Sequence, residues 1–180
     1  MPNLPENYTL HSALGLDSLN ARTFHEIAKL RQEVFVLEQD CVYLDLDGRD
    51  TESTTEQFWV AAPLPAQAAP PQAGESGGAA PSSSQPVVAA TLRVLDESAR
   101  EPGLHAIGRV VTSANHRGKA LAAALMEAAV ARYGSGPLVL EAQSHLTGWY
   151  ERFGFVVDGD EFVEDGIPHT PMRRPLAARS

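Results

Sequence analysis

The sequence predicts a mixed α/β protein (α+β layered), in which helices pack on a β-sheet. β-rich runs over residues 58–62, 87–95 and 138–142 alternate with segments of helical character. An Ala- and Leu-rich segment over 117–133 lies between two β-rich runs, 105–112 and 138–142. At least one strand–helix–strand crossover is therefore expected.

The length and composition limit the class of protein. The chain has 180 residues, of which 43% are hydrophobic, so we expect one compact domain over residues 1–180. The formal charge of −9 argues against nucleic acid as a partner, because a polyanionic backbone rewards clustered Lys and Arg. No apolar run approaches the ~20 residues that span a bilayer, so no membrane partner is expected. The start of the chain lacks the pattern of a secretory signal and Cys41 is the sole cysteine, which together favour a cytoplasmic location.

Before the first β-rich run, apolar residues recur every three or four positions, which predicts one face of a helix. Thr23 with Glu26 forms a candidate capping box, and Ser18 and Asn20 are rival caps. The apolar residues of this helix face are Phe24, Ile27, Leu30, Val34 and Leu37. A polar stretch over 45–52 follows the helix.

Residues 63–86 differ in composition from the rest of the chain, with six prolines, three glycines, no aromatic residue and one charge. Such a segment cannot bury enough apolar surface to offset the entropy of ordering it. It lies between two β-rich runs, and neither side alone makes a complete domain. We expect a flexible hairpin insertion within one domain, with a linker between two domains as the alternative.

The second half of the chain predicts further elements. The helix over 117–133 has Leu121, Leu125 and Ala129 on one side and ends before Gly134. The expected order is strand 87–95, strand 105–112, helix 117–133, strand 138–142, short helix 145–152, strand 153–157, and late strands near Val163 and over 168–174.

The turn that opens this helix has the features of an anion site. Small side chains let an anion approach the main chain, and the free N–H groups and dipole of a helix start favour a phosphate or pyrophosphate. Arg117 or Lys119 would add positive charge. The alternative is an ordinary helix start with Gly118 at a tight corner.

Several blocks of the sequence resemble a known superfamily. Arg117-x-x-Ala120-x-Ala122 resembles the loop of the GNAT acetyltransferases that holds the pyrophosphate of acetyl-CoA, and Tyr150 before Gly154-Phe155 resembles their later motif. The likeness spans about Leu30 to Arg174, apart from 63–86. The blocks that resemble the ElaA branch are Val34-Phe-Val-Leu-Glu-Gln39, Asp47-Gly48, Gly108-Arg-Val110, Gln143, His145-Leu146, Phe153-Gly-Phe155 and Glu164-Asp-Gly-Ile-Pro-His169.

The resemblance implies a fold and a cosubstrate. The expected sheet is mixed and mostly antiparallel, has a splayed parallel pair of strands and is flanked by helices. Acetyl-CoA is the expected cosubstrate, without a metal. Ala120 stands where the superfamily usually has glycine, which is compatible with a negative φ and costly with a positive one. Val42 and Gln57 also depart from the pattern, which places proline and histidine there, and Gln57 puts in doubt a substrate role at that position. The expected cofactor-binding residues are Val110, Val111, Thr112, Arg117, Gly118, Lys119, Ala120, Leu121 and Ala122.

The resemblance also implies direct acetyl transfer to an amine. A primary ammonium has a pKa near ~10, so a base must accept a proton, and the thioester oxygen needs main-chain N–H donors. Tyr150 is the expected proton donor to the departing sulfur, although it could instead pack in the core with its hydroxyl bonded. Three residues are candidates for the base: Glu38, His145 and Glu141. Each also has a non-catalytic interpretation. Glu38 could be a solvated carboxylate at a helix end, His145 a structural histidine, and Glu141 a carboxylate on a solvent-exposed strand face.

Other chemistry has less support. The six histidines show no paired ligand spacing, so no metal site is expected. Cys41 as a nucleophile, with His145 or His169 as base, is a further alternative.

The leading hypothesis is an acetyl-CoA-dependent N-acetyltransferase for an amine of a small molecule or peptide. A catalytically weak GNAT-like module that binds or senses CoA is the alternative, and a nucleotide-binding α/β protein is a third. Many proteins of this fold are dimers, so a homodimer is compatible with the resemblance. Acidic clusters over 45–56 and 158–165 favour a cationic acceptor.

Overall fold

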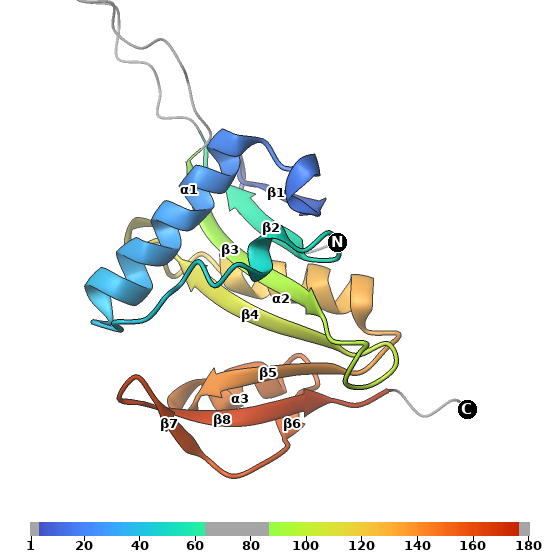
Figure 1. Ribbon diagram of the computed structural model, residues 1–180. Coiled ribbons are helices and arrows are strands. Elements are labelled where there is room, and N and C mark those ends of the chain that lie inside the picture. The colour runs from blue at the N-terminus through green and yellow to red at the C-terminus, as the bar shows by residue number, and fades with distance from the viewer. Residues whose placement is uncertain (1–3, 64–86, 177–180) are drawn as a thin grey trace, which may run out of the picture.

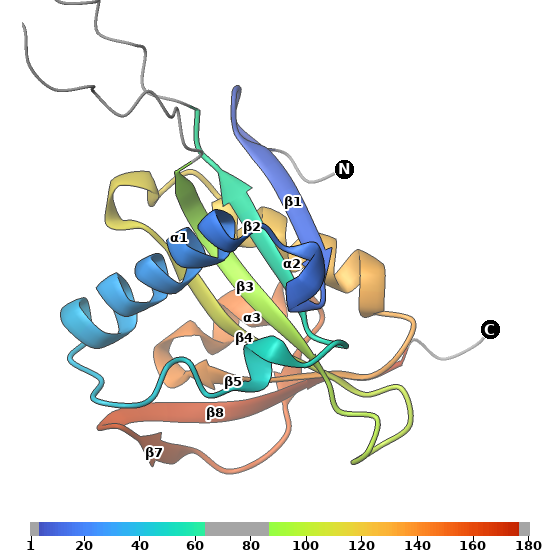
Figure 2. The same ribbon diagram turned by 45° about the horizontal axis from the view of Figure 1, so that its top comes forward.

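The computed structural model describes residues 4–63 and 87–176, which form a mixed eight-stranded sheet with helices on both faces (Figures 1 and 2). The strand order is β1-β2-β3-β4-β5-β8-β6, and β7 also pairs with β8. This arrangement confirms the predicted fold class. The strands are β1 Thr9–Leu14, β2 Glu56–Ala61, β3 Val88–Asp96, β4 His105–Thr112, β5 Leu138–Gln143, β6 Val156–Val157, β7 Phe162–Glu164 and β8 Ile167–Arg174.

Three α-helices within the described residues cover the sheet. Helix α1 lies on one face, and α2 and α3 lie on the other (Figures 1 and 2). Each face therefore has its own apolar core: Ile27 and Leu30 of α1 pack near Val111 on one side, while Leu125 and Met126 of α2 are fully buried on the other. The helices are α1 Ala21–Arg31, α2 Leu121–Tyr133 and α3 Thr147–Glu151, with a π-helical segment over Gln32–Glu38 and 3-10 turns over Leu16–Ser18, Arg49–Thr51, Ala114–His116 and Ser144–Leu146.

The N-cap of helix α1 is Asn20, one of the two alternatives to the predicted capping box. The side chain of Asn20 accepts a hydrogen bond of 2.9 Å from the main-chain N–H of Arg22, as expected of an N-cap. Thr23 lies inside the helix, so the predicted capping box with Glu26 is wrong.

The apolar face of α1 ends earlier than the sequence predicts. Leu30 and Val34 are buried as expected, but Leu37 is 77% exposed. The cause is the π-helical segment, in which the N–H of Gln39 donates to the carbonyl of Val34 five residues back. The wider turn rotates the following side chains, so the 3.6-residue period no longer places Leu37 over the sheet.

Helix α2 begins at Leu121 and not near Arg117 as predicted, and it ends before Gly134 as predicted. Its first residue follows Ala120, whose φ of 57° and ψ of 21° are left-handed. A right-handed helix cannot continue backwards through that conformation, so Arg117 to Ala120 form a loop. Leu121, Leu125 and Ala129 are buried on one side, as the spacing predicts.

Strands β4 and β5 form the splayed parallel pair. They pair only at His105 with Leu138 and at Ala106 with Val139, after which they diverge. The other strand pairs in the part of the chain that the structure describes are antiparallel. The mostly antiparallel sheet with one splayed parallel pair is thereby confirmed.

Two short regions differ from the prediction. The strand expected over 153–157 covers only Val156–Val157, because Gly154 turns the chain with a φ of 85°. The edge strand β1 was not predicted, since its mostly exposed side chains lack an apolar repeat.

Strands β2 and β3, which flank the proline-rich segment, are antiparallel neighbours. The insertion predicted over 63–86 itself lies outside the described residues from 64 onward. None of the helices within 4–63 and 87–176 is long and apolar enough to cross a membrane.

Candidate active site

A pocket of about 960 Å³ opens where β4 and β5 diverge. Its walls come from five parts of the chain that are far apart in sequence: the π-helical segment with the loop after it, β4, the loop before α2, the end of β5 with α3, and the β7–β8 turn. Every residue that the sequence predicts as catalytic or cofactor-binding lines it, and so does Glu141.

One wall is the loop before α2. Gly118 and Ala120 have φ values of 74° and 57°, and no side chain caps the first turn of the helix. The N–H groups of that turn are therefore free donors, and Leu121 to Ala123 line the pocket. A Cβ added at Gly118 would meet nothing within 4 Å, so the loop is open to an approaching group. These residues fit the phosphates of CoA, with the helix dipole adding to the attraction.

The φ of Ala120 is positive, which is the costly one of the two possibilities named from the sequence. A left-handed φ in a residue with a Cβ costs roughly 1–2 kcal/mol relative to glycine. Strain of this kind persists where the surrounding structure fixes it, and it gathers at functional sites.

A second wall is the edge of β4 that faces β5. Beyond Ala106 this edge has no pairing with β5, and residues Val110 to Thr112 line the pocket. Main-chain groups on an unpaired strand edge are available to a ligand, which is the requirement for holding a thioester oxygen.

Tyr150 lies on α3 and lines the pocket. Tyr150 is only 7% exposed, and its ring packs edge-on against Trp149 and Phe155. Burial raises its pKa to about 12, so the phenol keeps its proton at neutral pH. Its hydroxyl has no hydrogen-bond partner within 4–63 and 87–176, unlike that of a core tyrosine bonded for structural reasons.

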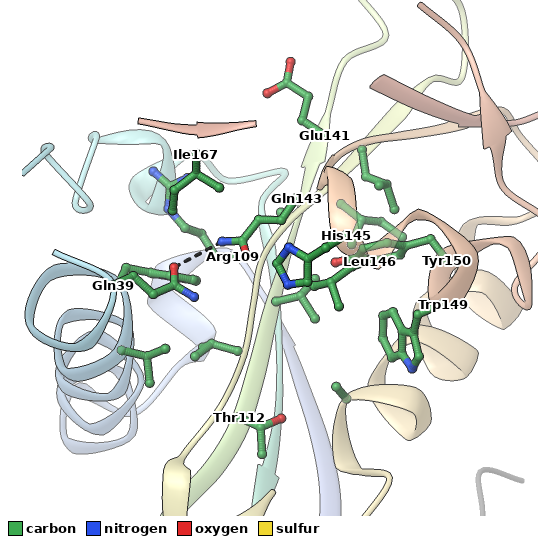
Figure 3. A pocket seen from close by; sticks show the side chains of 18 of the residues that line it. Gln39, Arg109, Thr112, Glu141, Gln143, His145, Leu146, Trp149, Tyr150 and Ile167 are labelled. Carbon is green, nitrogen blue, oxygen red and sulfur yellow. Dashed lines mark hydrogen bonds between the residues drawn. The ribbon is translucent and has the colours of Figure 1, made fainter. Parts of the chain in front are cut away.

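The three candidate bases differ in their surroundings. Both carboxylate oxygens of Glu38 lie 2.8 Å from Nη2 of Arg117, and this hydrogen bond lowers the pKa of Glu38. Glu141 is exposed, and Figure 3 shows its carboxylate pointing away from the labelled side chains near Tyr150. His145 and Tyr150 project into the same part of the pocket (Figure 3).

Cys41 is buried and lines the pocket. Burial raises the pKa of its thiol, and the carboxylates of Asp165, Asp40 and Glu164 raise it further. A nucleophilic cysteine needs the opposite environment, so the site disfavours a Cys41 thiolate. Within the ranges that the structure describes, no group of three or more His, Cys, Asp or Glu side chains could hold a metal ion.

Two amides bridge the pocket between the loop after the π-helical segment and β5. Nε2 of Gln143 donates to Oε1 of Gln39 over 3.2 Å, as Figure 3 shows. The bond links these two walls of the pocket.

The acidic stretch over 45–56 is not a free negative patch, which corrects the hint of a cationic acceptor drawn from it. Its buried carboxylates are paired: Asp45 and Asp50 with the fully buried Arg31, and Glu56 with Arg132. The arginine partners of these carboxylates lie 14 to 76 residues away in the sequence. A local sequence pattern therefore does not reveal the pairing.

Gln57, which departs from the family pattern, is also in this network and outside the pocket. It is 3% exposed and donates to Asp50 over 2.8 Å. Its position is structural, so it gives no reason to doubt the site.

Sequence reasoning gave no role to Arg109 or Tyr43, both of which line the pocket. The guanidinium of Arg109 lies 5.0 Å from the centre of the Tyr43 ring. Arg109 belongs to the Gly108-Arg-Val110 block, so the resemblance could have identified it as a site residue. The sequence itself does not indicate which residues it contacts.

Comparison with known proteins agrees with this geometry. The family described as acetyltransferase (GNAT) domain matches residues 80–176. A UPF0039 protein of Mycobacterium tuberculosis is 42% identical over 157 residues, covering 87% of each chain. Protein ElaA of Escherichia coli is 30% identical over 172 residues, covering 92% of this chain and 93% of ElaA.

Solved structures give the same result. A crystal structure of an acyl-CoA N-acyltransferase from Pseudomonas aeruginosa matches with a TM-score of 0.73 and 33% identity, covering 93% of this chain and 99% of that one. The crystal structure of Escherichia coli ElaA matches with a TM-score of 0.72 and 26% identity over the same shares. The splayed sheet, the loop before α2 and these relatives together place the chain in the GNAT acyltransferase superfamily, in the branch that includes ElaA.

Proposed function

We propose that this protein is an acetyl-CoA-dependent N-acetyltransferase that transfers acetyl directly to an amine of a small molecule or peptide. The observation that carries the proposal is the convergence of three features on one pocket: the uncapped start of α2, the unpaired edge of β4 and the hydroxyl of Tyr150. The name of the Pseudomonas aeruginosa neighbour, an acyl-CoA N-acyltransferase, supports the same reaction class.

The loop before α2 would bind the cosubstrate. Its N–H donors and the charges of Arg117 and Lys119 suit a pyrophosphate. Arg117 is half-exposed and uses Nη2 on Glu38, which leaves other guanidinium donors for phosphate oxygens.

Acetyl-CoA supplies a thioester that a neutral amine can attack. The edge of β4 from Val110 to Thr112 would hold the thioester oxygen as negative charge develops on it. Tyr150 would donate a hydrogen bond to the sulfur as negative charge develops on it and would give its proton to the departing thiolate, because its raised pKa keeps the phenol protonated at neutral pH.

The arrangement favours His145 as the group that takes the ammonium proton, directly or through water. It shares its part of the pocket with Tyr150, whereas Glu38 is paired with Arg117 and Glu141 points elsewhere. An imidazole is well suited to this task near neutral pH.

The test is acetyl transfer to a panel of primary amines, followed as release of free CoA thiol, with wild type and Tyr150→Phe. We expect transfer by the wild type and a loss of turnover on the order of a hundredfold in the variant, with little change in CoA affinity by calorimetry. Turnover equal to wild type would remove Tyr150 from the acid role. Tight CoA binding by the wild type, with no transfer to any amine, would instead support a CoA-binding or sensing module.

A further inference from the structure

A β-bulge interrupts β4 at the pocket. Arg93 of β3 pairs with Gly108 and Thr91 pairs with Val111, so Arg109 and Val110 face the single residue Leu92. Arg109 has a φ of 54°. Glycine takes this left-handed conformation without steric cost, whereas arginine costs roughly 1–2 kcal/mol there.

The side chain of Arg109 reaches from the bulge to the loop after the π-helical segment. Its Nε lies 2.9 Å from a carboxylate oxygen of Asp45, and its Nη2 lies 3.4 Å from Asp47 and 3.3 Å from the carbonyl of Asp45. Its guanidinium also faces the ring of Tyr43, which lines the pocket. One side chain therefore connects the strand edge expected at the thioester with the wall expected at the acceptor.

Each carboxylate that Arg109 contacts has a second arginine partner. Asp45 keeps the buried Arg31 at 2.9 Å, and Asp47 keeps two hydrogen bonds from Arg93 at 2.7 and 2.8 Å. The side chain of Arg109 is 23% exposed, against 0% for Arg31 and 4% for Arg93. Arg31 and Arg93 are therefore the buried arginines of this network, and Arg109 is its arginine that lines the pocket.

We propose that Arg109 is a positioning residue, which fixes the bulge of β4 and the Tyr43 wall relative to each other. It does not itself need to touch the reacting atoms. Misplacing either wall by about 1 Å is enough to slow an oriented reaction on the order of a hundredfold. The reaction in this inference is the proposed acetyl transfer.

The experiment compares Arg109→Gln and Arg109→Lys with wild type, and uses Arg132→Gln as the matched control. Arg132 makes the same kind of ion pair, to Glu56, away from the pocket. Two measurements are made: kcat and acceptor KM for acetyl transfer, and amide hydrogen exchange of the segments 40–47 and 107–112. If Arg109→Gln does not fold, Arg109→Gly replaces it, because glycine accepts the φ of 54°.

We expect Arg109→Gln to lower kcat about 10- to 100-fold and to raise acceptor KM, while exchange rises in both segments together. Arg109→Lys should recover part of the loss, since an ammonium reaches one carboxylate but cannot form the guanidinium fork. Arg132→Gln should match wild type in all of these.

The outcomes separate this inference from the proposed function. Transfer by wild type with unchanged kcat, KM and exchange in Arg109→Gln would overturn the positioning role alone. Absence of transfer in the wild type would overturn the proposed function, and the exchange measurement would still decide the inference: increased exchange in both segments supports it, and unchanged exchange rejects it.

Discussion

Among the residues that line the pocket, Ala120 and Arg109 have left-handed backbone conformations that favour glycine. Ala120 lies before the start of α2, and Arg109 lies at the bulge of β4. Strain of roughly 1–2 kcal/mol at each is maintained by the rest of the fold. At Arg109 the side chain makes ion pairs that glycine cannot make, whereas Ala120 is exposed and its side chain cannot form an ion pair.

Replacing Ala120 by glycine should therefore stabilise the protein. Relief of the strained φ exceeds the entropy that glycine adds to the unfolded chain, so the free energy of unfolding should rise by about 0.5–1 kcal/mol. Urea denaturation measures the change. The matched control is Ala128→Gly inside α2, which should lower the free energy of unfolding by about 1 kcal/mol. A decrease in both variants would show that the φ of Ala120 is not strained.

Tyr150 and His145 illustrate what a motif can predict at the scale of a residue. Their identity and spacing were sufficient to select them as site candidates. The unpartnered hydroxyl of Tyr150, and the ion pair that occupies Glu38, depend on contacts made by distant segments, and the spacing holds no information about those.

At the scale of the element, the loop before α2 combines an open backbone with an uncapped helix start. The sequence predicted the anion site from small side chains and nearby charge, and it placed the helix start about one turn too early. A left-handed residue at 120 is what separates the loop from the helix. The shift leaves Arg117 to Ala120 as irregular backbone that can follow the shape of a pyrophosphate.

Gly118 tests the placement of the cosubstrate in this loop. Gly118→Glu should weaken CoA binding by about tenfold or more in titration calorimetry, because a carboxylate would face the phosphates. Gly118→Ala is the control: it carries the same strain at a φ of 74°, and its Cβ would enter open space. Equal affinities for the two variants would place the phosphates elsewhere.

The π-helical segment is the element where periodicity failed. Apolar spacing predicted one face from Phe24 to Leu37, and tertiary packing ended it at Val34. The wider turn brings Glu38 and Gln39 over the pocket, where they contact Arg117 and Gln143. A regular helix would have buried Leu37 and turned these polar groups elsewhere.

At the scale of the whole molecule, the formal charge of −9 hides a buried network with no net charge. Arg31, Arg93 and Arg109 face Asp45, Asp47 and Asp50, and together they join α1, its following loop, β3 and β4. Breaking such a network is costly because it leaves a charge buried without a partner.

The network should make stability depend on pH through Asp47. Hydrogen bonds from Arg93 lower its pKa to about 2, against ~3.9 in an unfolded chain. Between these values the unfolded state binds more protons than the folded state, so the stabilisation is present above pH ~4 and is lost as the pH falls towards 2. Its size is about 1–2 kcal/mol after allowance for partial exposure.

Chemical denaturation between pH 6 and pH 2.5 measures this dependence. Asp47→Asn should remove part of the decrease in unfolding free energy on acidification, and Asp158→Asn, which changes an exposed carboxylate of the same chain, should leave the decrease intact. Parallel curves for wild type and Asp47→Asn would contradict the role of Asp47.

The sequence by itself determined the layered α/β class, the buried face of α2, the resemblance to GNAT acyltransferases and the candidate catalytic and cofactor-binding residues. These depend on local periodicity and on motifs within short stretches, which the chain carries without folding. Tertiary structure alone decided the left-handed φ of Ala120, the exposure of Leu37, the edge strand β1 and the partners of each buried carboxylate. The physical reason is that strain, exposure and charge pairing depend on atoms from segments far apart in sequence, and only the folded chain brings those atoms together.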